Sequence, residues 1–407
     1  MYIRENRVGV SDESNSLTVG VVRETYPGES RVALIPDLVP ALAKSGLKVC
    51  VESGAGRAAG HLDDEYTSKG AEILSDRKAV FEREDIITQV RGLGANPEAG
   101  QADVGLMRKG QTIIGQLDPL TEPKTCQTLA DAGVTSFSLE LLPRITRAQS
   151  MDVLSSMATI AGYKAVLLAA DHLNRMFPLL MTAAGTLAPA RVLIIGVGVA
   201  GLQAIATARR LGALVSAYDI RPAVREQVES LGAKFVELDI DTGEAEGKGG
   251  YAKAMGEDFY KKQRELMAEI CAGHDVIITT AAVPGKKAPI LVTAEMVRRM
   301  GPGSLIVDLA AERGGNVELT KAGETVVEND VTILGPENLP SSVPYHASQM
   351  YGKNVQTFLQ HLVKEGQLQI DTEDEITRDT LITRDGQVVN ERVREALNPG
   401  SSGGGAG

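Results

Sequence analysis

Short apolar runs alternate with stretches of helical periodicity along most of the chain. Before residue 150, the runs with the length and β-branched content of buried strands are Leu17–Val22, Leu47–Glu52, Ile86–Val90, Thr112–Leu117 and Thr135–Leu139. Between the first two, Pro36–Lys44 combines a proline near a helix start with apolar residues at helical spacing. Strands that alternate with helices are typical of parallel βαβ units.

A second series of the same kind follows one long apolar helix, which is predicted over Ser150–Asn174. The strands after it are predicted at Arg191–Ile195, Leu214–Tyr218, Lys234–Val236, Asp275–Thr279, Ser304–Asp308 and Val331–Leu334. We expect a further helix, Ala347–Glu365, to lead the chain back to the first series. Ile376–Val389 is predicted to form a hairpin around the turn pair Asp385-Gly386.

The two series predict two α/β lobes, each a doubly wound parallel sheet. Their expected boundaries are residues 17–150 with 345–395 for the first lobe and residues 151–344 for the second. Residues 1–16 are polar and residues 396–407 are rich in Gly and Ser, which predicts flexible ends. A Gly-rich stretch without apolar period interrupts the second series, and it predicts a mobile loop over residues 241–256.

Charge and composition exclude one class of partner. Of the 407 residues, 42 are Lys or Arg and 53 are Asp or Glu, so the net charge is −11. The aromatic fraction is 4% and there is no Trp. Such a chain lacks both the basic face and the stacking platform that nucleic-acid binding needs, and we expect no nucleic-acid partner.

The cysteines and the apolar runs bear on the cellular compartment. Cys50, Cys126 and Cys271 are far apart and match no metal-ligand spacing, so we expect free thiols in a reducing compartment and no metal site. The N-terminal residues lack the apolar segment of a secretory signal. The longest nearly apolar run, Val192–Ala208, contains Gln203 and three Gly, so no membrane span is expected.

A Gly-rich sequence follows the first strand of the second series. The motif Gly196-Val197-Gly198-Val199-Ala200-Gly201 lies between a β-branched strand and a helix, and the next strand ends at Asp219, 21 residues past Gly198. This is the context of a dinucleotide-binding Rossmann fold. There, Gly196 allows the tight turn, Gly198 lets a pyrophosphate approach the helix N-terminus, and Gly201 lets the helix pack closely on the strand.

The acidic residue of this motif bears on the choice of nucleotide. A carboxylate at Asp219 can accept hydrogen bonds from both hydroxyls of an adenine ribose and repels a 2′-phosphate, which favours NAD(H). Ile220 follows in the same loop, and Arg221 beside it can bind that phosphate, which weakens the preference. A Gly-rich turn that binds no nucleotide is the structural alternative.

Two later strand ends are further candidates. Thr280, Ala281 and Ala282 follow a predicted strand, and the segment Asp308–Asn316 follows the next one. In an open parallel sheet the loops at the carboxyl ends of strands line the ligand crevice, so these residues are expected to border the cofactor. A plain turn is the alternative. In the Gly-rich stretch, Tyr251 is the large side chain available to pack on a ligand.

Several segments resemble one family. Leu142–Lys164 (LPRITRAQSMDVLSSMATIAGYK) is similar to the signature of the NAD(H)-binding domain I of proton-translocating NAD(P) transhydrogenase. The Gly-rich motif and the segments GGYAKAMGEDFYKKQ, VPGKKAP and NLPSSVP are similar as well, in the family's order over roughly residues 17–395. The resemblance implies a two-lobed homodimer, without a membrane span of its own, that binds NAD(H) and presents NADH to NADP⁺ on a separate domain III or beta subunit. It also implies coupling to proton movement through membrane domain II, and a place on the cytoplasmic face of the inner membrane through these partner subunits.

The resemblance also implies roles for individual residues. Arg144, Asp152 and Ser155 match the family positions that hold the nicotinamide carboxamide. Gln149 matches the position that contacts the ribose near the reacting ring and aligns the two nucleotides, and Tyr251 matches the tyrosine of a loop that closes on bound nucleotide. The structural alternatives are an ion pair between Arg144 and Asp152, a helix-surface hydroxyl at Ser155 and a loop residue at Tyr251. Direct hydride transfer needs alignment and exclusion of water but no general acid or base.

Alanine dehydrogenase shares the two-lobed fold and is the rival interpretation. The segment GVVRETYPGESRVALIP resembles the substrate lobe of that enzyme, whose substrate-binding arginine matches Arg31 and whose lysine falls near Arg91. Its histidine aligns near Gln116, which cannot move a proton, and its catalytic acid aligns near Glu312. The five His are scattered and offer no replacement. A third interpretation is a module that binds NAD without performing chemistry.

Overall fold

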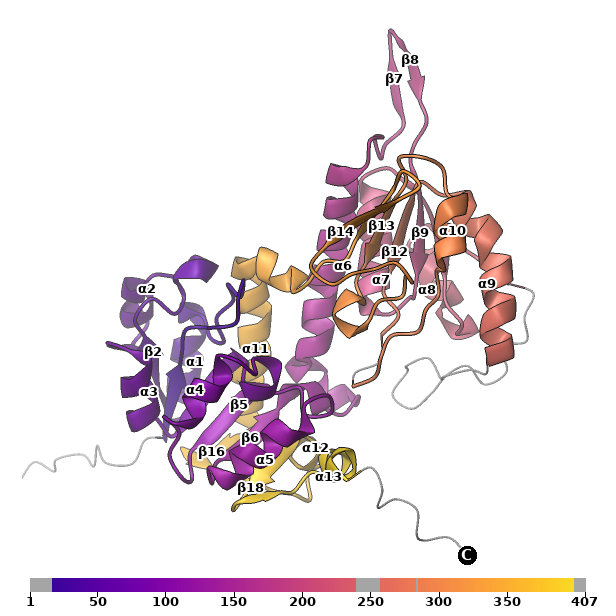
Figure 1. Cartoon of the computed structure of the whole chain (residues 1–407). Coiled ribbons are helices and arrows are strands. Elements are labelled where there is room, and N and C mark those ends of the chain that lie inside the picture. The colour runs from indigo at the N-terminus through magenta and orange to yellow at the C-terminus, as the bar shows by residue number, and fades with distance from the viewer. Residues whose placement is uncertain (1–16, 239–256, 283–284, 399–407) are drawn as a thin grey trace, which may run out of the picture.

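Two twisted sheets with helices on their faces form two lobes, which lie side by side in the computed structural model (Figure 1). The structure describes residues 17–238, 257–282 and 285–398. Tyr251, the predicted flexible N-terminus 1–16, the predicted mobile loop 241–256 and most of the predicted tail lie outside these residues.

The first lobe contains an eight-stranded sheet in the order β19-β18-β6-β5-β4-β1-β2-β3. Its strands are β1 Leu17–Val21, β2 Leu47–Glu52, β3 Glu72–Leu74, β4 Ile86–Arg91, β5 Thr112–Gln116, β6 Thr135–Ser138, β18 Leu381–Arg384 and β19 Gln387–Val388. The first six pair in parallel, whereas β18 and β19 add an antiparallel edge. The sheet therefore joins strands from both ends of the chain.

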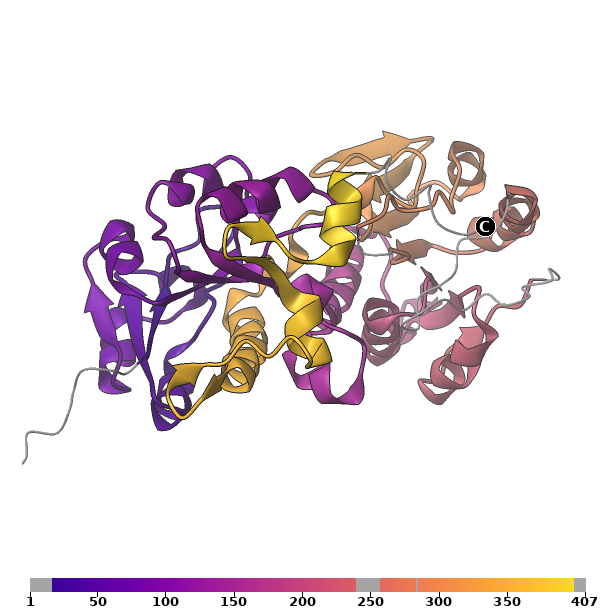
Figure 2. The same cartoon turned by 90° about the horizontal axis from the view of Figure 1, so that it is seen from below.

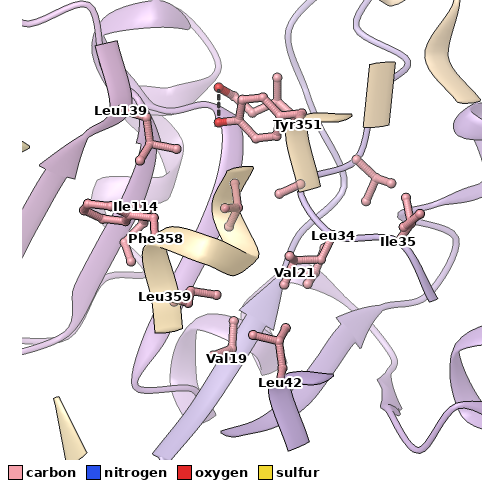
Figure 3. Close-up of a cluster of buried hydrophobic side chains, with 14 of the residues drawn as sticks. Val19, Val21, Leu34, Ile35, Leu42, Ile114, Leu139, Tyr351, Phe358 and Leu359 are labelled. Atoms are coloured by element: carbon pink, nitrogen blue, oxygen red, sulfur yellow. Dashed lines mark hydrogen bonds between the residues drawn. The ribbon is translucent and has the colours of Figure 1, made fainter. Parts of the chain in front are cut away.

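The helices of this lobe lie between its strands or follow them along the chain. They are η1 Pro36–Leu38, α1 Val39–Lys44, η2 Arg57–Ala59, α2 Asp63–Ser68, α3 Arg77–Arg83, η3 Leu93–Ala95, α4 Gly100–Val104, α5 Pro123–Asp131, η4 Leu139–Leu141, η5 Thr146–Met151, α11 Pro344–Leu362, α12 Glu375–Thr380 and α13 Glu391–Leu397. Figure 3 shows Tyr351, Phe358 and Leu359 of α11 packed among apolar side chains of the sheet and of the segment before α1. This burial explains why α11 belongs to the first lobe although it follows the second series.

The second lobe contains a seven-stranded sheet in the order β11-β10-β9-β12-β13-β15-β14. Its strands are β9 Arg191–Ile195, β10 Leu214–Tyr218, β11 Lys234–Phe235, β12 Val276–Thr279, β13 Leu305–Asp308, β14 Thr325–Glu328 and β15 Val331–Leu334. Its helices are α6 Val153–His172, α7 Val199–Arg210, η6 Pro222–Val224, α8 Arg225–Ser230, α9 Glu257–Ala272, α10 Ala294–Arg299, η8 Ala311–Arg313 and η9 Leu339–Ser342. β14 is antiparallel and the other strands are parallel, so the strand order reverses between β9 and β12.

The predicted α/β class and the predicted strands are confirmed, with strand ends that agree to within one residue. Three predictions at the C-terminal end were partly wrong. Ile376–Thr380 is helical, because Asp374 caps α12 by accepting from the backbone N–H groups of Ile376 and Thr377, so the hairpin is confined to β18 and β19. The long helix ends at Leu362 instead of Glu365, where a short hairpin of β16 Val363–Lys364 and β17 Gln367–Leu368 begins. Helix α13 extends to Leu397, into the predicted tail.

Helix α6 belongs to both lobes. Val153, Met157 and Ile160 are buried in the core of the first lobe, whereas Ala165 and Val166 are buried in the core of the second. It is the one helix in the described ranges that is long and apolar enough to cross a membrane, with a mean hydropathy of 1.5 over the window tested. Buried core helices meet the same criterion, and the sequence analysis passed over this helix.

A two-stranded hairpin projects from the second lobe (Figure 1). It consists of β7 Leu180–Thr182 and β8 Gly185–Leu187, and it was not predicted. Met181 is 78% exposed and Leu187 is 49% exposed. Seen from below in Figure 2, the C-terminal strands and helices of the chain lie against the first lobe.

Candidate functional site

The Gly-rich motif forms the turn between β9 and α7. Gly196 has a φ of 96°, in the left-handed region that favours glycine. A Cβ on Gly201 would lie 2.0 Å from the Gly196 carbonyl oxygen, so the first turn of α7 packs directly on the strand end. A Cβ on Gly198 would meet nothing within 4 Å. The backbone at Gly198 therefore borders open space, as close approach of a ligand requires.

The N-terminus of α7 faces the same space. The first N–H groups of a helix have no intrahelical acceptor, and the helix dipole favours an anion there. Gly198 is the N-cap residue and offers no side chain that could occupy these donors. Val199 is 37% exposed and Ala200 is partly buried, so the first turn is accessible. This end of α7 can hold a phosphate group.

Asp219 lies directly after β10 and is already paired within the chain. Its Oδ2 accepts from the backbone N–H of Val197 at 2.7 Å. The Arg221 side chain donates to both oxygens, from Nε to Oδ1 at 2.8 Å and from Nη2 to Oδ2 at 2.7 Å. Ile220 between them is partly buried against the apolar cluster on the other face of the sheet. The predicted ribose ligand is thus in position beside the turn, but its oxygens have partners of their own.

The loop after β12 closes the turn from the other side. Thr280 donates from its hydroxyl to the Gly196 carbonyl oxygen at 2.8 Å. Ala281 is partly buried and Ala282 is exposed. The predicted candidates Thr280, Ala281 and Ala282 therefore lie at the same edge of the sheet as the Gly-rich motif.

A buried carboxylate and amide hold this edge of the sheet in place. Asp308 at the end of β13 is fully buried and accepts hydrogen bonds from five groups, including the Thr279 hydroxyl at 2.9 Å and the Asn316 backbone N–H at 2.8 Å. The Asn316 side chain accepts from the Ala281 N–H at 3.0 Å and donates to the Ala281 carbonyl oxygen at 2.8 Å. Sequence analysis named this segment but not the bracing role, which the polar residues after a buried strand indicate.

The residues assigned to the nicotinamide end lie at the start of α6. Asp152 is the N-cap of this helix, and it accepts from the Ser155 backbone N–H at 2.9 Å and from the Ser155 hydroxyl at 2.6 Å. Gln149 and Arg144 are exposed and precede the helix, Gln149 within η5. The structure thus brings Asp152 and Ser155 into contact as a helix cap and places Gln149 next to them in the chain.

Gly162 links this end of α6 to the Gly-rich turn, and the sequence analysis missed it. A Cβ on Gly162 would lie 2.1 Å from the Ala200 carbonyl oxygen, so α6 and α7 touch through their backbones here. A helix rises about 1.5 Å per residue, so Asp152 lies about 15 Å along α6 from this contact. The signal in the sequence was a glycine inside a long apolar helix.

Two family models together match most of the chain. The model for the N-terminal domain of alanine dehydrogenase/PNT matches residues 20–161, and the model for the C-terminal domain matches residues 165–391. The chain belongs to the alanine dehydrogenase/PNT family. The resemblance predicted from the sequence segments is therefore confirmed.

Relatives within the family divide into two kinds of enzyme. The first of the two alpha-subunit chains of NAD(P) transhydrogenase from Rhodospirillum rubrum is 46% identical over 377 residues, 92% of this chain and 98% of that protein. A solved structure of transhydrogenase from Sinorhizobium meliloti is 43% identical with a TM-score of 0.82, over 91% of this chain and 100% of that one. Alanine dehydrogenase of Bacillus subtilis is 29% identical over 389 residues, 94% of this chain and 95% of that protein. The family thus leaves both chemistries to be weighed on the residues.

Arg31 is bound to acidic and amide groups of the chain itself. It is 3% exposed and donates to Glu29 from Nε at 2.8 Å and from Nη2 at 2.6 Å. Its Nη2 also donates to the Asn338 Oδ1 at 3.1 Å, so the first lobe contacts the segment before η9. Burial opposes ionisation of Glu29, but the hydrogen bonds and charge of Arg31 outweigh it and lower the pKa of Glu29 to about 2.

Arg91 lies beside this pair at the end of β4. Its guanidinium lies 4.3 Å from the centre of the Tyr26 ring, and its Nε lies 3.4 Å from Glu29 Oε2. Its Nη2 lies 3.8 Å from Glu312 Oε1, and Glu312 in turn accepts from the Asn338 backbone N–H at 2.5 Å. Both candidate substrate arginines thus take part in a charged contact between the lobes.

Gln116 lies next to Arg91, since the two are register partners on β5 and β4. The five His are all among the described residues and have contacts elsewhere. His61 stacks on Tyr345, His274 bonds to the Ile270 carbonyl oxygen before β12, and His361 lies 3.2 Å from Asp374. His172 is in the last turn of α6, and His346 is exposed near the start of α11. At the strand end where alanine dehydrogenase is expected to have its histidine, this chain has an amide.

Proposed function

We propose that the chain is the NAD(H)-binding subunit of a proton-translocating NAD(P) transhydrogenase. The observation that supports this most directly is the open backbone at Gly198 before the N-terminus of α7. Its relatives named as transhydrogenase subunits support the same activity. In this proposal the chain presents NADH for direct hydride transfer to NADP⁺ on a partner subunit, and membrane subunits couple the transfer to proton translocation.

The residues of the site would divide the work along the nucleotide. The first turn of α7 would bind the pyrophosphate and Asp219 the adenine ribose. Arg144, Asp152 and Ser155 would hold the nicotinamide carboxamide, and Gln149 would align the two nucleotides. Bound NADH supplies the hydride from its nicotinamide ring. Tyr251 would close over it, although this residue lies outside the described ranges.

The chemistry proposed here fits side chains that transfer no proton. Reductive amination of a 2-oxo acid needs a group that exchanges a proton with substrate, which the amide of Gln116 cannot do. Hydride transfer between two nicotinamides moves no proton at the reacting carbons, so alignment and exclusion of water are sufficient. Arg31 and Arg91 keep the alanine dehydrogenase activity as the second candidate, because they place two guanidinium groups at the cleft edge of the first lobe.

NADH binding and amination can be measured in the same sample. Purified chain is titrated with NADH while the fluorescence of the reduced nicotinamide is followed, and pyruvate and ammonium are then added. Bound NADH without loss of absorbance at the nicotinamide band is the expected result. Steady oxidation of NADH would overturn the transhydrogenase assignment in favour of an amino-acid dehydrogenase. A chain that does not bind NADH would overturn both.

We also propose a homodimer and a peripheral location. The hairpin of β7 and β8 exposes Met181 and Leu187 beyond the body of the second lobe, and exposed apolar side chains on a projecting arm suit contact with a second copy. The partner subunits would hold the dimer at the cytoplasmic face of the inner membrane. Light scattering should give twice the chain mass for the wild type and a smaller mass for Met181→Asp. A monomeric wild type would contradict the proposal.

A further inference from the structure

All the acceptor positions of Asp219 are in use. A carboxylate can accept about four hydrogen bonds. Oδ1 accepts from the Arg221 backbone N–H at 2.9 Å and from its Nε at 2.8 Å. Oδ2 accepts from the Val197 N–H at 2.7 Å and from the Arg221 Nη2 at 2.7 Å. An adenine ribose that donates two hydroxyls to Asp219 therefore competes with groups of the chain.

The two classes of competing donor differ in how readily they can leave. The backbone N–H groups of Val197 and Arg221 are fixed by the turn and by the loop after β10. The guanidinium of Arg221 ends a flexible side chain and can rotate away. It is held by a further bond from Nη2 to the Val197 carbonyl oxygen at 3.2 Å, and its side chain is 14% exposed against 5% for Asp219. A ribose can thus reach Asp219 if the guanidinium moves.

We propose that Arg221 controls which nucleotide the site accepts, because its guanidinium occupies the ribose-binding oxygens of Asp219 and is displaced when an adenine ribose binds. The inference rests on the NAD(H) binding proposed above. Displacement lowers the affinity for NADH by the cost of breaking the ion pair. The same guanidinium offsets the charge of Asp219, so it reduces the repulsion of a 2′-phosphate. Arg221 therefore narrows the preference for NADH over NADPH.

The test compares both nucleotides on the wild type and on Arg221→Met, which keeps the length of the side chain and removes its charge and donors. Dissociation constants are measured by nicotinamide fluorescence. We expect NADH to bind about fivefold more tightly to the variant and NADPH to bind more weakly, so that the ratio of the two constants changes at least about tenfold.

Arg225→Met is the matched control, because it removes the same charge nearby. Arg225 pairs with Glu237 and lies over the Phe235 ring, away from Asp219. Its ratio of constants should stay within twofold of the wild type. Arg221→Lys is a second variant, which keeps the charge but not the forked geometry. It should bind NADPH like the wild type and NADH more tightly. Melting temperatures without nucleotide establish that each variant is folded.

The opposite outcome has a distinct signature. If Arg221 only holds Asp219 in position, Arg221→Met will bind NADH more weakly and leave NADPH unchanged, and the inference is then wrong. The inference is also wrong if wild-type chain binds NADH and neither constant responds to Arg221→Met. A wild-type chain that binds neither nucleotide overturns the proposed function together with the inference.

Discussion

Gly162 and Ala200 meet backbone to backbone, and a Cβ on Gly162 would lie 2.1 Å from the Ala200 carbonyl oxygen. The contact joins α6, which packs in both lobes, to the second residue of α7. The start of α6 carries Asp152 and Ser155, and the start of α7 carries the proposed phosphate site. One helix-helix contact therefore sets the distance between the two ends of the proposed nucleotide site.

Gly162→Ala should separate these two helices. The added methyl group cannot be accommodated at 2.1 Å, so we expect a loss of about 1–3 kcal/mol in the free energy of unfolding. NADH affinity should fall as well, because the first turn of α7 shifts. Gly105→Ala is the control, since its Cβ would meet the Ala102 carbonyl oxygen at an ordinary 3.6 Å. Denaturant unfolding that gives equal stability for both variants would show that the contact is not tight.

Gly198→Ala and Gly201→Ala should fail in different ways. A Cβ on Gly201 would lie 2.0 Å from the Gly196 carbonyl oxygen, which predicts a lower melting temperature. A Cβ on Gly198 meets nothing within 4 Å in the protein, so the melting temperature should stay within about 2 °C of the wild type. NADH should nevertheless bind at least about tenfold more weakly to Gly198→Ala, because the methyl group occupies the approach of the pyrophosphate. Unchanged NADH affinity would remove Gly198 from the site.

The parts of this region that follow local rules could be predicted from the sequence. The strand, turn and helix around Gly196 and the acidic end of β10 follow from spacing and periodicity alone. The pairing of Asp219 with Arg221 could not be predicted, because it depends on a side-chain conformation and not on spacing. The Gly162 contact and the bracing by Asn316 involve segments 38 and 35 residues apart. Nothing in the local pattern shows which of the many glycines and asparagines makes such a contact.

The same limit applies to the ends of the fold. The return of α11 to the first lobe could be predicted, because an apolar helical stretch after the last strand needs a core to cover it. The β7–β8 hairpin and the antiparallel edge strand β14 are short, and much of their surface is exposed, so they leave little hydrophobic pattern. Helix α12 begins at a cap formed by Asp374, which overrides the strand-like alternation of Ile376–Thr380.

Glu24 should make the stability of the first lobe depend on pH. Burial raises the pKa of Glu24 to about 7, against two backbone N–H groups, of Val90 and Arg91, that favour the charged form. The folded state therefore holds a proton that the unfolded state loses near pH 4.5. Its contribution is fully present below that pH and is lost as pH rises through about 7.

The Glu24→Gln variant isolates this contribution. Between pH 5 and 8 the wild type should lose about 2 kcal/mol more than the variant in the free energy of unfolding. The difference between the two is the relevant quantity, because the lowered pKa values of His61, His274 and His361 act in the opposite direction in both. Glu29 does not titrate in this window, since its pKa is lowered to about 2. Parallel stability curves for wild type and variant would contradict the account of Glu24.

Gln149→Asn should slow hydride transfer without weakening NADH binding. Gln149 is exposed, so a side chain shorter by one methylene group should leave stability unchanged. If the amide aligns the two nicotinamides, its withdrawal should lower the single-turnover rate at least about tenfold. Gln127→Asn, at an exposed position on α5, is the control for the amide change itself. A Gln149 variant with the wild-type rate would exclude an aligning role.

The central claim is direct transfer of hydride from NADH on this chain to NADP⁺ on a partner. The most direct measurement uses NADH deuterated at the transferred position of the nicotinamide, purified chain, and membranes that carry the NADP⁺-binding and membrane subunits. We predict that NADPH forms only when the chain is added, and that it carries the deuterium with no exchange into water. NADPH without deuterium, or no NADPH at all while the chain oxidises NADH with pyruvate and ammonium, would contradict the account.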